Sequence, residues 1–536
     1  MSLFSVLQFL RVLIPIVMIG GATLFSYAGV AGEKPNILVI LADDMGWSDA
    51  GCYGSEIRTP AIDSLAREGM LSTRCYTIPR CSPSRAALMT GRYPQSVGMG
   101  HLDNDLELPG YRGRLDPSCR TLPEILGEKA GYRTYMSGKW HLGSKIGERP
   151  WERGFQRYFG LLSGANSYVT LDKGRLMAED GKILEAADLP EDFYMTEAIT
   201  RKALSYLDDA AKHPDMPFFM YVAYTAPHTP LQASRRTIDS YKGTYSEGFE
   251  AVRLKRFKKQ KSLHIIPADT QIPENRKLPD TTTREEDMRM AIYAAQITDM
   301  DEGIGQILDR LKKYGMEDKT IVLFLSDNGA TNENPARVYS PYPGEKWTRA
   351  GYGKNWAVVS NTPYFGFKSG TYEGGESIPC LVKYPGKIPA GKRFDGMMHM
   401  IDIAPTLLEC AGVPALAEMN GINLLPYWQE NRVGSPSPWK NSVAAGLPER
   451  ILCTEHEKKR SVHSLYWKLH KNVRERQWSL FASDDRCELK NVASVHKDVV
   501  ADLAKRYENW ARSNNVDESM RTYWPLLKGK QEEKKK

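Results

Sequence analysis

Cysteine is scarce in this sequence, with eight residues in a chain of 536. So few cysteines in a chain of this length do not form a disulfide framework, and the lack of any Cys-x-x-Cys spacing argues against a zinc site. The sequence leaves open whether Cys453 pairs with Cys487. If Cys81 takes part in chemistry, seven cysteines remain, so at least one of them is unpaired.

Charge of one sign is not in large excess, since 72 Lys and Arg oppose 65 Asp and Glu, a net charge of +7. With 41% hydrophobic and 26% charged residues and a mean hydropathy of −0.45, the chain is typical of a globular protein, neither disordered nor membrane-embedded. Basic residues gather only in RLKRFKKQK (253–261) and the terminal KKK, so we expect no nucleic-acid partner. We expect 253–261 to form a solvated helix face; contact with a polyanionic substrate is the alternative.

Long apolar runs are missing too, except near the start of the chain. Arg11 is the only charge before Glu33, and it precedes VLIPIVMIGGATLF and then the small residues of SYAGVAG. This pattern predicts a signal peptide over residues 1–31, cleaved after Ala31 or Ala28, and export to the periplasm or the medium with no stable membrane partner. An uncleaved anchor is the alternative, but the run is short for a span of about 20 residues and contains a proline and two glycines.

Four short apolar runs end abruptly at polar residues, as strands buried on both faces do. They span 36–44, 132–141, 217–228 and 320–329. Helical patterns alternate with them over 61–69, 122–131 and 285–315. This alternation predicts an α/β fold, a sandwich of helices around a mostly parallel sheet.

The sequence pattern changes after about residue 430. Residues 461–472 and 477–485 alternate like solvent-faced antiparallel strands, and 494–514 is typical of a covering helix. We therefore expect a catalytic domain over 32–430, a small α+β subdomain over 431–525 and a charged tail over 526–536.

Ionisable residues follow each of the four predicted strands, where ligands bind in such sheets. They are Asp43 and Asp44, Lys139 and His141, His228, and Asp327 and Asn328. The acidic and amide side chains offer only oxygen, which suits a hard cation; Ca²⁺ tolerates looser geometry than Mg²⁺, and the sequence leaves the choice open. With Arg85, Lys139 and Lys368 added, the metal-loaded pocket carries roughly +2 and favours an anion.

Cys81 opens the segment CSPSRAALMTGR (81–92). Pro83 fits near a helix start, so residue 81 is expected at the positive end of a helix dipole, with Arg85 one turn further on the same face. A buried free cysteine is the alternative, since a thiolate is a poor ligand for a hard metal. A covalently altered oxygen nucleophile would suit both the metal and the dipole.

CSPSRAALMTGR resembles the C-x-P-S-R-x-x-L-x-T-G-R motif of type I sulfatases. The resemblance continues through KPNILVILADDMG, GYRTYMSGKWHLG, APHTPLQ, DKTIVLFLSDNGA, GFKSGTYEGG and IDIAPTLLECAGV, and GYRGRL and LLSGANSY are most similar to bacterial arylsulfatases. It implies an alkaline-phosphatase-like fold with a large mixed, mostly parallel central sheet and a small C-terminal antiparallel sheet with a helix. It also implies that a formylglycine-generating enzyme oxidises Cys81 to formylglycine (3-oxoalanine) before folding finishes.

The resemblance further implies a role for each site residue. Asp43, Asp44, Asp327, Asn328 and an oxygen of modified Cys81 would bind one Ca²⁺. One hydroxyl of hydrated formylglycine would attack sulfur and expel the alcohol, and the second would then collapse to the aldehyde and release sulfate. Arg85 would hold the hydroxyls, Lys139 and Lys368 the sulfate oxygens, His141 a formylglycine hydroxyl, and His228 would protonate the leaving oxygen.

Three positions fall outside this assignment. Trp140 is expected in the core and His101 is not assigned to the site. Arg486 stands where related chains have proline, which puts a C-terminal turn in doubt.

The sequence thus predicts an exported, arylsulfatase-type hydrolase of sulfate monoesters. The alternatives are a carbohydrate or polysaccharide sulfatase with the same mechanism, a phosphodiester or phosphonate hydrolase, and a non-catalytic binder of sulfated glycans.

Overall fold

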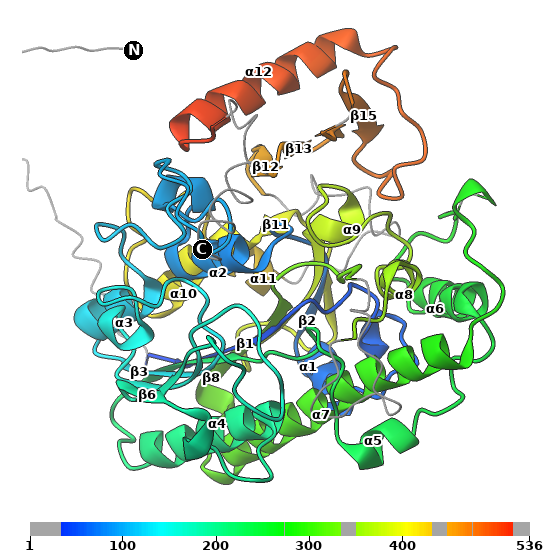
Figure 1. The fold of residues 1–536 in the computed structure, drawn as a ribbon. Coiled ribbons are helices and arrows are strands. Elements are labelled where there is room, and N and C mark those ends of the chain that lie inside the picture. Colours follow the sequence, from blue (N-terminus) through cyan, green and yellow to red (C-terminus); the bar gives the residue numbers. More distant parts are fainter. Residues whose placement is uncertain (1–33, 273, 334–349, 431–446, 474, 518–536) are drawn as a thin grey trace, which may run out of the picture. The chain divides into compact units, whose positions relative to one another are not determined.

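The computed structural model describes residues 34–517 except 273, 334–349, 431–446 and 474 (Figure 1). The predicted signal peptide and charged tail lie outside these residues. All described helices and strands belong to the unit that starts at Pro35. None of the helices in these ranges is both long and apolar enough to cross a membrane.

The centre of this unit is an 11-stranded mixed sheet in the order β10-β2-β9-β8-β1-β7-β3-β4-β5-β6, with β11 beside β2. Its strands are β1 (Asn36–Ala42), β2 (Met70–Tyr76), β3 (Arg133–Gly138), β4 (Arg157–Leu161), β5 (Met177–Glu179), β6 (Lys182–Leu184), β7 (Phe218–Ala223), β8 (Thr320–Ser326), β9 (Ser377–Lys383), β10 (Lys392–Phe394) and β11 (Met398–His399). Strands β8, β1, β7, β3 and β4 are parallel, whereas β9, β5 and β6 join by antiparallel pairs. The predicted mostly parallel α/β sheet is confirmed.

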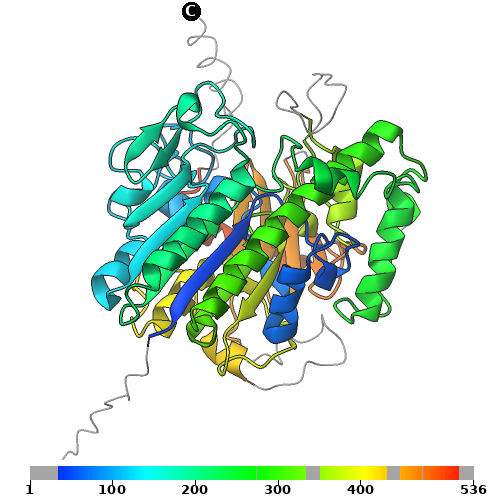
Figure 2. The same cartoon turned by 90° about the horizontal axis from the view of Figure 1, so that it is seen from below.

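Helices cover both faces of this sheet. The described helices up to residue 430 are α1 (Pro60–Glu68), α2 (Cys81–Thr90), α3 (Leu122–Ala130), α4 (Met195–Ala210), α5 (Arg235–Asp239), α6 (Phe249–Ser262), α7 (Arg284–Lys313), α8 (Lys354–Ser360), α9 (Glu373–Glu376), α10 (Ile403–Cys410) and α11 (Leu425–Gln429). Short 3-10 helices are η1 (Gly51–Tyr53), η2 (Pro94–Val97), η3 (Pro150–Glu152), η4 (Ala186–Asp188), η5 (Glu274–Arg276), η6 (Glu317–Lys319) and η7 (Met400–Asp402). Figure 2 shows α4 and α7 running along one face.

Alternate side chains of β1 pack into two hydrophobic clusters, one on each face of the sheet. Leu38 and Ile40 pack into the cluster that α1, α4 and α7 cover, while Ile37 and Val39 pack into the cluster of α2, α3 and α10. Because alternate side chains of a strand point to opposite faces, a continuous apolar run is buried on both sides. The predicted strand therefore sits at the centre of the molecule's core.

A second, four-stranded antiparallel sheet follows, with α12 (Lys497–Ser513) over it (Figure 1). Its strands are β12 (Leu452–His456), β13 (Lys459–His463), β14 (Trp467–Lys471) and β15 (Ser479–Ala482). The expectation of solvent-faced strands here is wrong. Lys468 and His470 are buried on the side of the sheet away from α12, where Lys468 pairs with Glu373 of α9 and with Glu488 of the segment after β15.

The basic segment 253–261 lies in α6, and only part of it is the solvated face that we expected. Lys255 is exposed, but Arg253 and Arg256 are buried. Arg256 lies 2.6 Å from Asp49 and 2.8 Å from Glu56, so its charge is neutralised inside the fold. These two arginines are therefore structural and do not face a substrate.

Candidate active site

Most of the predicted site residues follow the carboxyl ends of neighbouring parallel strands. The last residues of β1 and β8 face each other in register, and the backbone N–H of Asp44 donates to Asp327 Oδ1 over 3.1 Å. The strands position the site residues as follows: β1 ends before Asp43 and Asp44, β3 before Lys139, and β8 before Asp327 and Asn328. Parallel strands bring these side chains together at one edge of the sheet, as their sequence positions suggested.

Cys81 is the first residue of α2, as predicted from Pro83, and the helix ends at Gly91 in the left-handed conformation. Its Sγ lies 3.9 Å from Asp44 Oδ1 and the residue is 3% exposed. Burial raises the pKa of the Cys81 thiol to about 12, although Lys139 and Lys368 act against it. The unmodified side chain is therefore a neutral thiol at physiological pH and a weak nucleophile.

Three cations hold the carboxylates in place. Lys139 Nζ lies 2.6 Å from Asp43 Oδ2 and Lys368 Nζ lies 2.7 Å from the Asp44 carboxylate. Burial alone would raise the pKa of Asp43, but Lys139 and its neighbouring cations hold that pKa well below the usual value. Asp43 is therefore ionised, and the pairs give a buried, alternating arrangement of charge.

Arg85 extends this arrangement to Asp327. Its Nε and Nη2 donate to Asp327 Oδ2 over 3.1 and 2.9 Å, and Nη1 donates to the carbonyl of Lys139 over 3.0 Å. Burial, followed by the charge of Asp43, raises the pKa of Asp327 to about 7 against the effect of Arg85. Arg85 therefore joins the strand ends of β3 and β8 from α2.

The oxygen atoms near Cys81 fit a hard cation. Among the described residues, the buried atoms Asp43 Oδ1 and Asn328 Oδ1 have no hydrogen-bond partner. Such atoms are costly to bury unless a ligand satisfies them, and a hard cation is bound by oxygen. Candidate donor atoms of Asp43, Asp44, Cys81 and His228 lie within 4.8 Å of one another.

This group differs in part from the ligand set that the resemblance implied. His228 is in it, whereas Asp327 is not. Asp327 uses one carboxylate oxygen for Arg85 and the other for the backbone of Asp44. Asn328 contacts Asp44 through its Nδ2, over 2.7 Å, so its amide group lies at the site.

Two histidines lie at the mouth of this site. Burial, followed by the charges of Lys139 and Arg85, lowers the pKa of His141 well below its usual value, so the ring is neutral. His228 Nε2 lies 3.5 Å from Asp44 Oδ2, and its Nδ1 lies 2.6 Å from the Thr229 carbonyl oxygen. If Nδ1 carries a proton for that carbonyl, Nε2 is the atom directed at the site.

The site opens into a cavity of about 340 Å³. Cys81, His141, His228 and Lys368 line it together with polar residues that sequence reasoning missed. These are Arg80, Asp103, Asn166, Asp172, Arg175 and Glu333. They lie in loops without periodic patterns; the only signal for any of them was the quoted segment LLSGANSY, which contains Asn166.

The structure also places a tryptophan, two cysteines and a histidine that the sequence singled out. Trp140 is fully buried in the core, as predicted. Cys453 and Cys487 are free cysteines, so the disulfide left open by the sequence is not formed. His101 lies outside the cavity lining and contacts Glu457.

Family models match most of the chain. A model described as Sulfatase matches residues 35–413, and a model described as N-sulphoglucosamine sulphohydrolase, C-terminal, matches residues 364–513. Together they span both the large sheet and the small one.

Individual sulfatases are also similar to this chain in sequence and in structure. The arylsulfatase of Klebsiella aerogenes is 37% identical over 414 residues, 71% of this chain and 87% of that protein. N-acetylgalactosamine-6-sulfatase of Homo sapiens is 31% identical over 427 residues, 76% of this chain and 68% of that protein. The crystal structure of Ps i-CgsB in complex with k-i-k-neocarrahexaose has a TM-score of 0.67 at 27% identity and covers 92% of this chain and 97% of its own. The resemblance and the alkaline-phosphatase-like fold that it implied are confirmed.

Proposed function

The chain belongs to the sulfatase family and is a sulfuric ester hydrolase, and from this premise we propose that it cleaves sulfate monoesters with a formylglycine nucleophile made from Cys81. The observation that carries the proposal is the position of residue 81. It begins α2 and lines the cavity, beside Asp44 and near Lys139 and Lys368. Since its thiol is un-ionised, a hydrated aldehyde is the better nucleophile.

The burial of residue 81 bears on how it is modified. Only 3% of Cys81 is exposed, so an oxidising enzyme would reach it in the unfolded chain. We therefore assign a formylglycine-generating enzyme as the maturation partner, acting before folding. Export with removal of residues 1–31 belongs to the same proposal, and N-terminal sequencing of the mature protein tests it.

The resident metal is proposed to be one Ca²⁺, held by Asp43, Asp44, Asp327, Asn328 and residue 81. Arg85 fixes the Asp327 carboxylate in place, and each of its oxygens keeps a lone pair for the ion. When bound, the ion would polarise the sulfate ester and favour ionisation of the nucleophile. Ca²⁺ is preferred to Mg²⁺ because the donors come from three separate segments, which suits a tolerant geometry.

The chain's own residues then divide the reaction between them. One hydroxyl of hydrated residue 81, having lost its proton to solvent, attacks sulfur; the S–O bond to the alcohol breaks, and His228 gives that oxygen a proton. Lys139 and Lys368 stabilise the sulfate oxygens, where negative charge develops. Neutral His141 accepts the proton of the second hydroxyl, and the C–O bond to sulfate breaks to regenerate the aldehyde.

Aryl sulfates are the proposed assay substrates, and a sulfated sugar is the second candidate for the natural one. Its support is the polar cavity lining, in which Asn166, Arg175 and Asp172 offer donors and acceptors to hydroxyl groups. Ps i-CgsB, at 27% identity, was solved with a neocarrahexaose.

Coexpression with a formylglycine-generating enzyme tests the function. We expect mass spectrometry of the peptide around residue 81 to show the aldehyde, metal analysis to show calcium, and nitrophenyl sulfate to release sulfate. Cys81→Ala should abolish turnover while circular dichroism remains unchanged. A fully modified, calcium-loaded protein that releases no sulfate, cleaves matched phosphate esters faster, or binds sulfated glycans without cleaving them would contradict the proposal.

A further inference from the structure

A second group of metal-ligating side chains lies outside the catalytic cavity. It joins His101, in the loop after η2, to His456, at the end of β12, and Glu457, in the turn that follows. His101 Nε2 lies 3.4 Å from Glu457 Oε1, and His456 Nε2 lies 3.8 Å from the same oxygen. Candidate donor atoms of all three lie within 4.8 Å of one another, a separation that a central ion can bridge with little adjustment.

His456 is the observation that points to a ligand. It is fully buried, and within the described part of the chain neither of its ring nitrogens has a hydrogen-bond partner. A buried imidazole left in this state destabilises a fold unless something satisfies it. Its ring is nearly parallel to that of His101, with an interplanar angle of 10° and centroids 5.4 Å apart.

Glu457 supplies the negative charge of the group. Its Oε2 is paired with Lys459 over 3.0 Å, which leaves Oε1 facing the two imidazoles. Its side chain is 38% exposed, so an ion and a water molecule can enter from this side. Two imidazoles, one carboxylate oxygen and a water make up a four-coordinate set.

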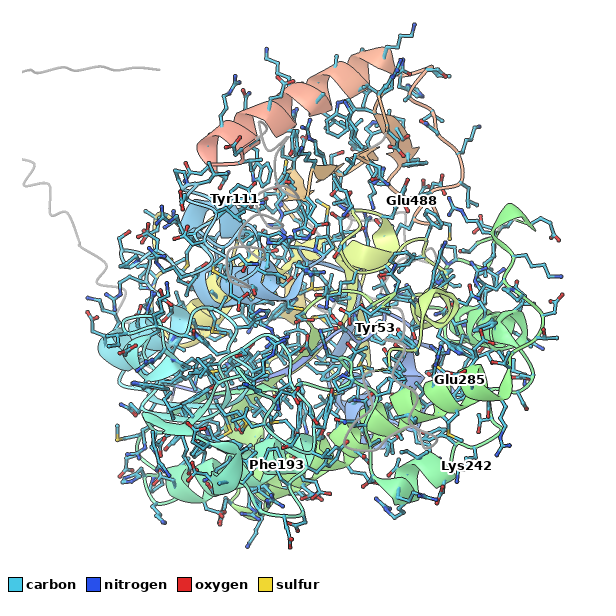
Figure 3. The ribbon with its side chains drawn as sticks, in the orientation of Figure 1. Tyr53, Tyr111, Phe193, Lys242, Glu285 and Glu488 are labelled. Atoms are coloured by element: carbon cyan, nitrogen blue, oxygen red, sulfur yellow. The ribbon has the colours of Figure 1, made fainter. Side chains whose placement is uncertain are left out.

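Neighbouring contacts hold these ligands in place. Tyr111, which Figure 3 labels beneath α12, donates to Glu455 Oε2 over 2.8 Å, and Gln95 donates to the Glu455 carbonyl over 3.0 Å. The N–H of Lys458 donates to Glu455 Oε1 over 2.8 Å and fixes the turn that presents Glu457. The segment containing His101 and the β12–β13 hairpin are therefore joined before any ion binds.

We propose that His101, His456 and Glu457 form a binding site for a divalent transition-metal ion of the zinc type. The ion would link the loop that contains His101 to the four-stranded C-terminal sheet. Imidazole is a softer donor than the oxygens around Cys81, so the two sites select different ions. The absence of Cys-x-x-Cys spacing in the sequence does not bear on a site built from histidine and glutamate.

The site adjoins the catalytic cavity. Leu102 and Asp103, which follow His101 directly, line it. Lys459, which pairs with Glu457, also donates to the Ser369 carbonyl over 2.7 Å, next to Lys368. An ion bound at this site would therefore restrain the segments that carry Asp103 and Lys368, although the ion itself would lie outside the cavity.

The test is a titration of the full-length protein with ZnCl₂ by calorimetry, in excess CaCl₂ so that the oxygen site is occupied. We expect the wild type to bind one more zinc equivalent than His456→Ala or His101→Ala. Loss of a ligand should weaken zinc binding by at least about 100-fold, since altered outer-shell partners alone cost about 10- to 100-fold. His213→Ala, which removes an exposed histidine, is the matched control and should bind as the wild type does.

Glu457→Gln provides a second test in case the variants of the buried histidines do not fold. The side chain at position 457 is partly exposed, and glutamine has nearly the same size as glutamate. It should fold, by circular dichroism, and lose the same zinc equivalent. Co²⁺ should give the wild type a four-coordinate visible absorption band that Glu457→Gln lacks. The proposal is overturned if the wild type binds no zinc at about 100 µM, far above the range of protein zinc sites, or if the cluster variants bind as much zinc as His213→Ala, equally tightly.

Discussion

Arg486 Nε donates to Glu373 Oε2 over 2.9 Å, and both side chains are only 1% exposed. Its other nitrogens donate to the Thr73 carbonyl over 2.6 Å and to Ser377 Oγ over 3.0 Å. One side chain of the segment after β15 thus binds β2, α9 and β9. The turn that the sequence put in doubt is formed without proline, with the N–H of Glu488 donating to the Asp485 carbonyl over 2.9 Å.

Arg486→Ala should lower the free energy of unfolding by about 3 kcal/mol, because removing one partner of a buried pair leaves the other charge uncompensated. The value is expected at the low end of the usual range, since Glu373 also lies 3.2 Å from Lys468. Urea denaturation measures it. Arg512→Ala, on the exposed side of α12, should change the value by less than about 0.5 kcal/mol. Equal values for both variants would show that Arg486 does not stabilise the packing of the C-terminal segment on β2, α9 and β9.

The sequence predicted the strands and the convergence of their ends because a buried parallel strand has a local pattern, and β1 and β8 show it. It also predicted that Cys81 begins a helix, from Pro83. It did not predict which loop residues line the cavity, Arg175 among them, and it did not predict that Lys468 and Arg256 are buried. Those positions depend on which distant segment packs against them, and a charged residue in a helix or strand carries no local sign of its partner.

Lys139→Ala and Lys368→Ala should each lower kcat/KM for nitrophenyl sulfate by roughly 100- to 1000-fold, through both kcat and KM. Each lysine offers positive charge to the sulfate oxygens and pairs with a carboxylate, Lys139 with Asp43 and Lys368 with Asp44. Lys145→Ala, close in sequence to Lys139 but exposed, should leave both constants unchanged. The measurement is steady-state kinetics of the variants that carry formylglycine at residue 81. An increase in KM with unchanged kcat would show that the lysines only bind substrate.

Gly164→Ala should lower kcat by about 10- to 100-fold, because a Cβ atom there would lie 2.4 Å from His141 Cε1 and Nε2 and would displace the ring from the cavity. Gly305→Ala is the control, since the nearest atom to its Cβ would be 3.6 Å away. Kinetics should separate the two variants while thermal melting leaves both folded. Unchanged kcat in Gly164→Ala would mean that the position of His141 is not critical.

His399 should make the protein less stable in mild acid. Burial lowers the pKa of His399 from 6.5 to about 3, so the folded state keeps the ring neutral while the unfolded chain takes up a proton below pH 6.5. Stability is therefore fully present above that pH and falls as the pH decreases, by up to about 2 kcal/mol at pH 5. His399→Asn keeps an acceptor for the Ile401 N–H and removes the titration. Urea denaturation at pH 7 and 5 should show a smaller loss in the variant; equal losses would contradict this source of acid sensitivity.

His228→Ala should impair alkyl sulfates far more than nitrophenyl sulfate. An alkoxide is a poor leaving group and needs a proton as the S–O bond breaks, and such proton transfer contributes about 100- to 10,000-fold to a rate. Nitrophenolate leaves without that help, so its loss should be small. His228 is suited to the task because its Nδ1 lies 2.6 Å from the Thr229 carbonyl oxygen, leaving Nε2 toward the site. The measurement is the ratio of kcat/KM for the two esters in wild type and variant. If both fall by the same factor, His228 instead holds the site through Asp44, 3.5 Å away, and the proton comes from another group.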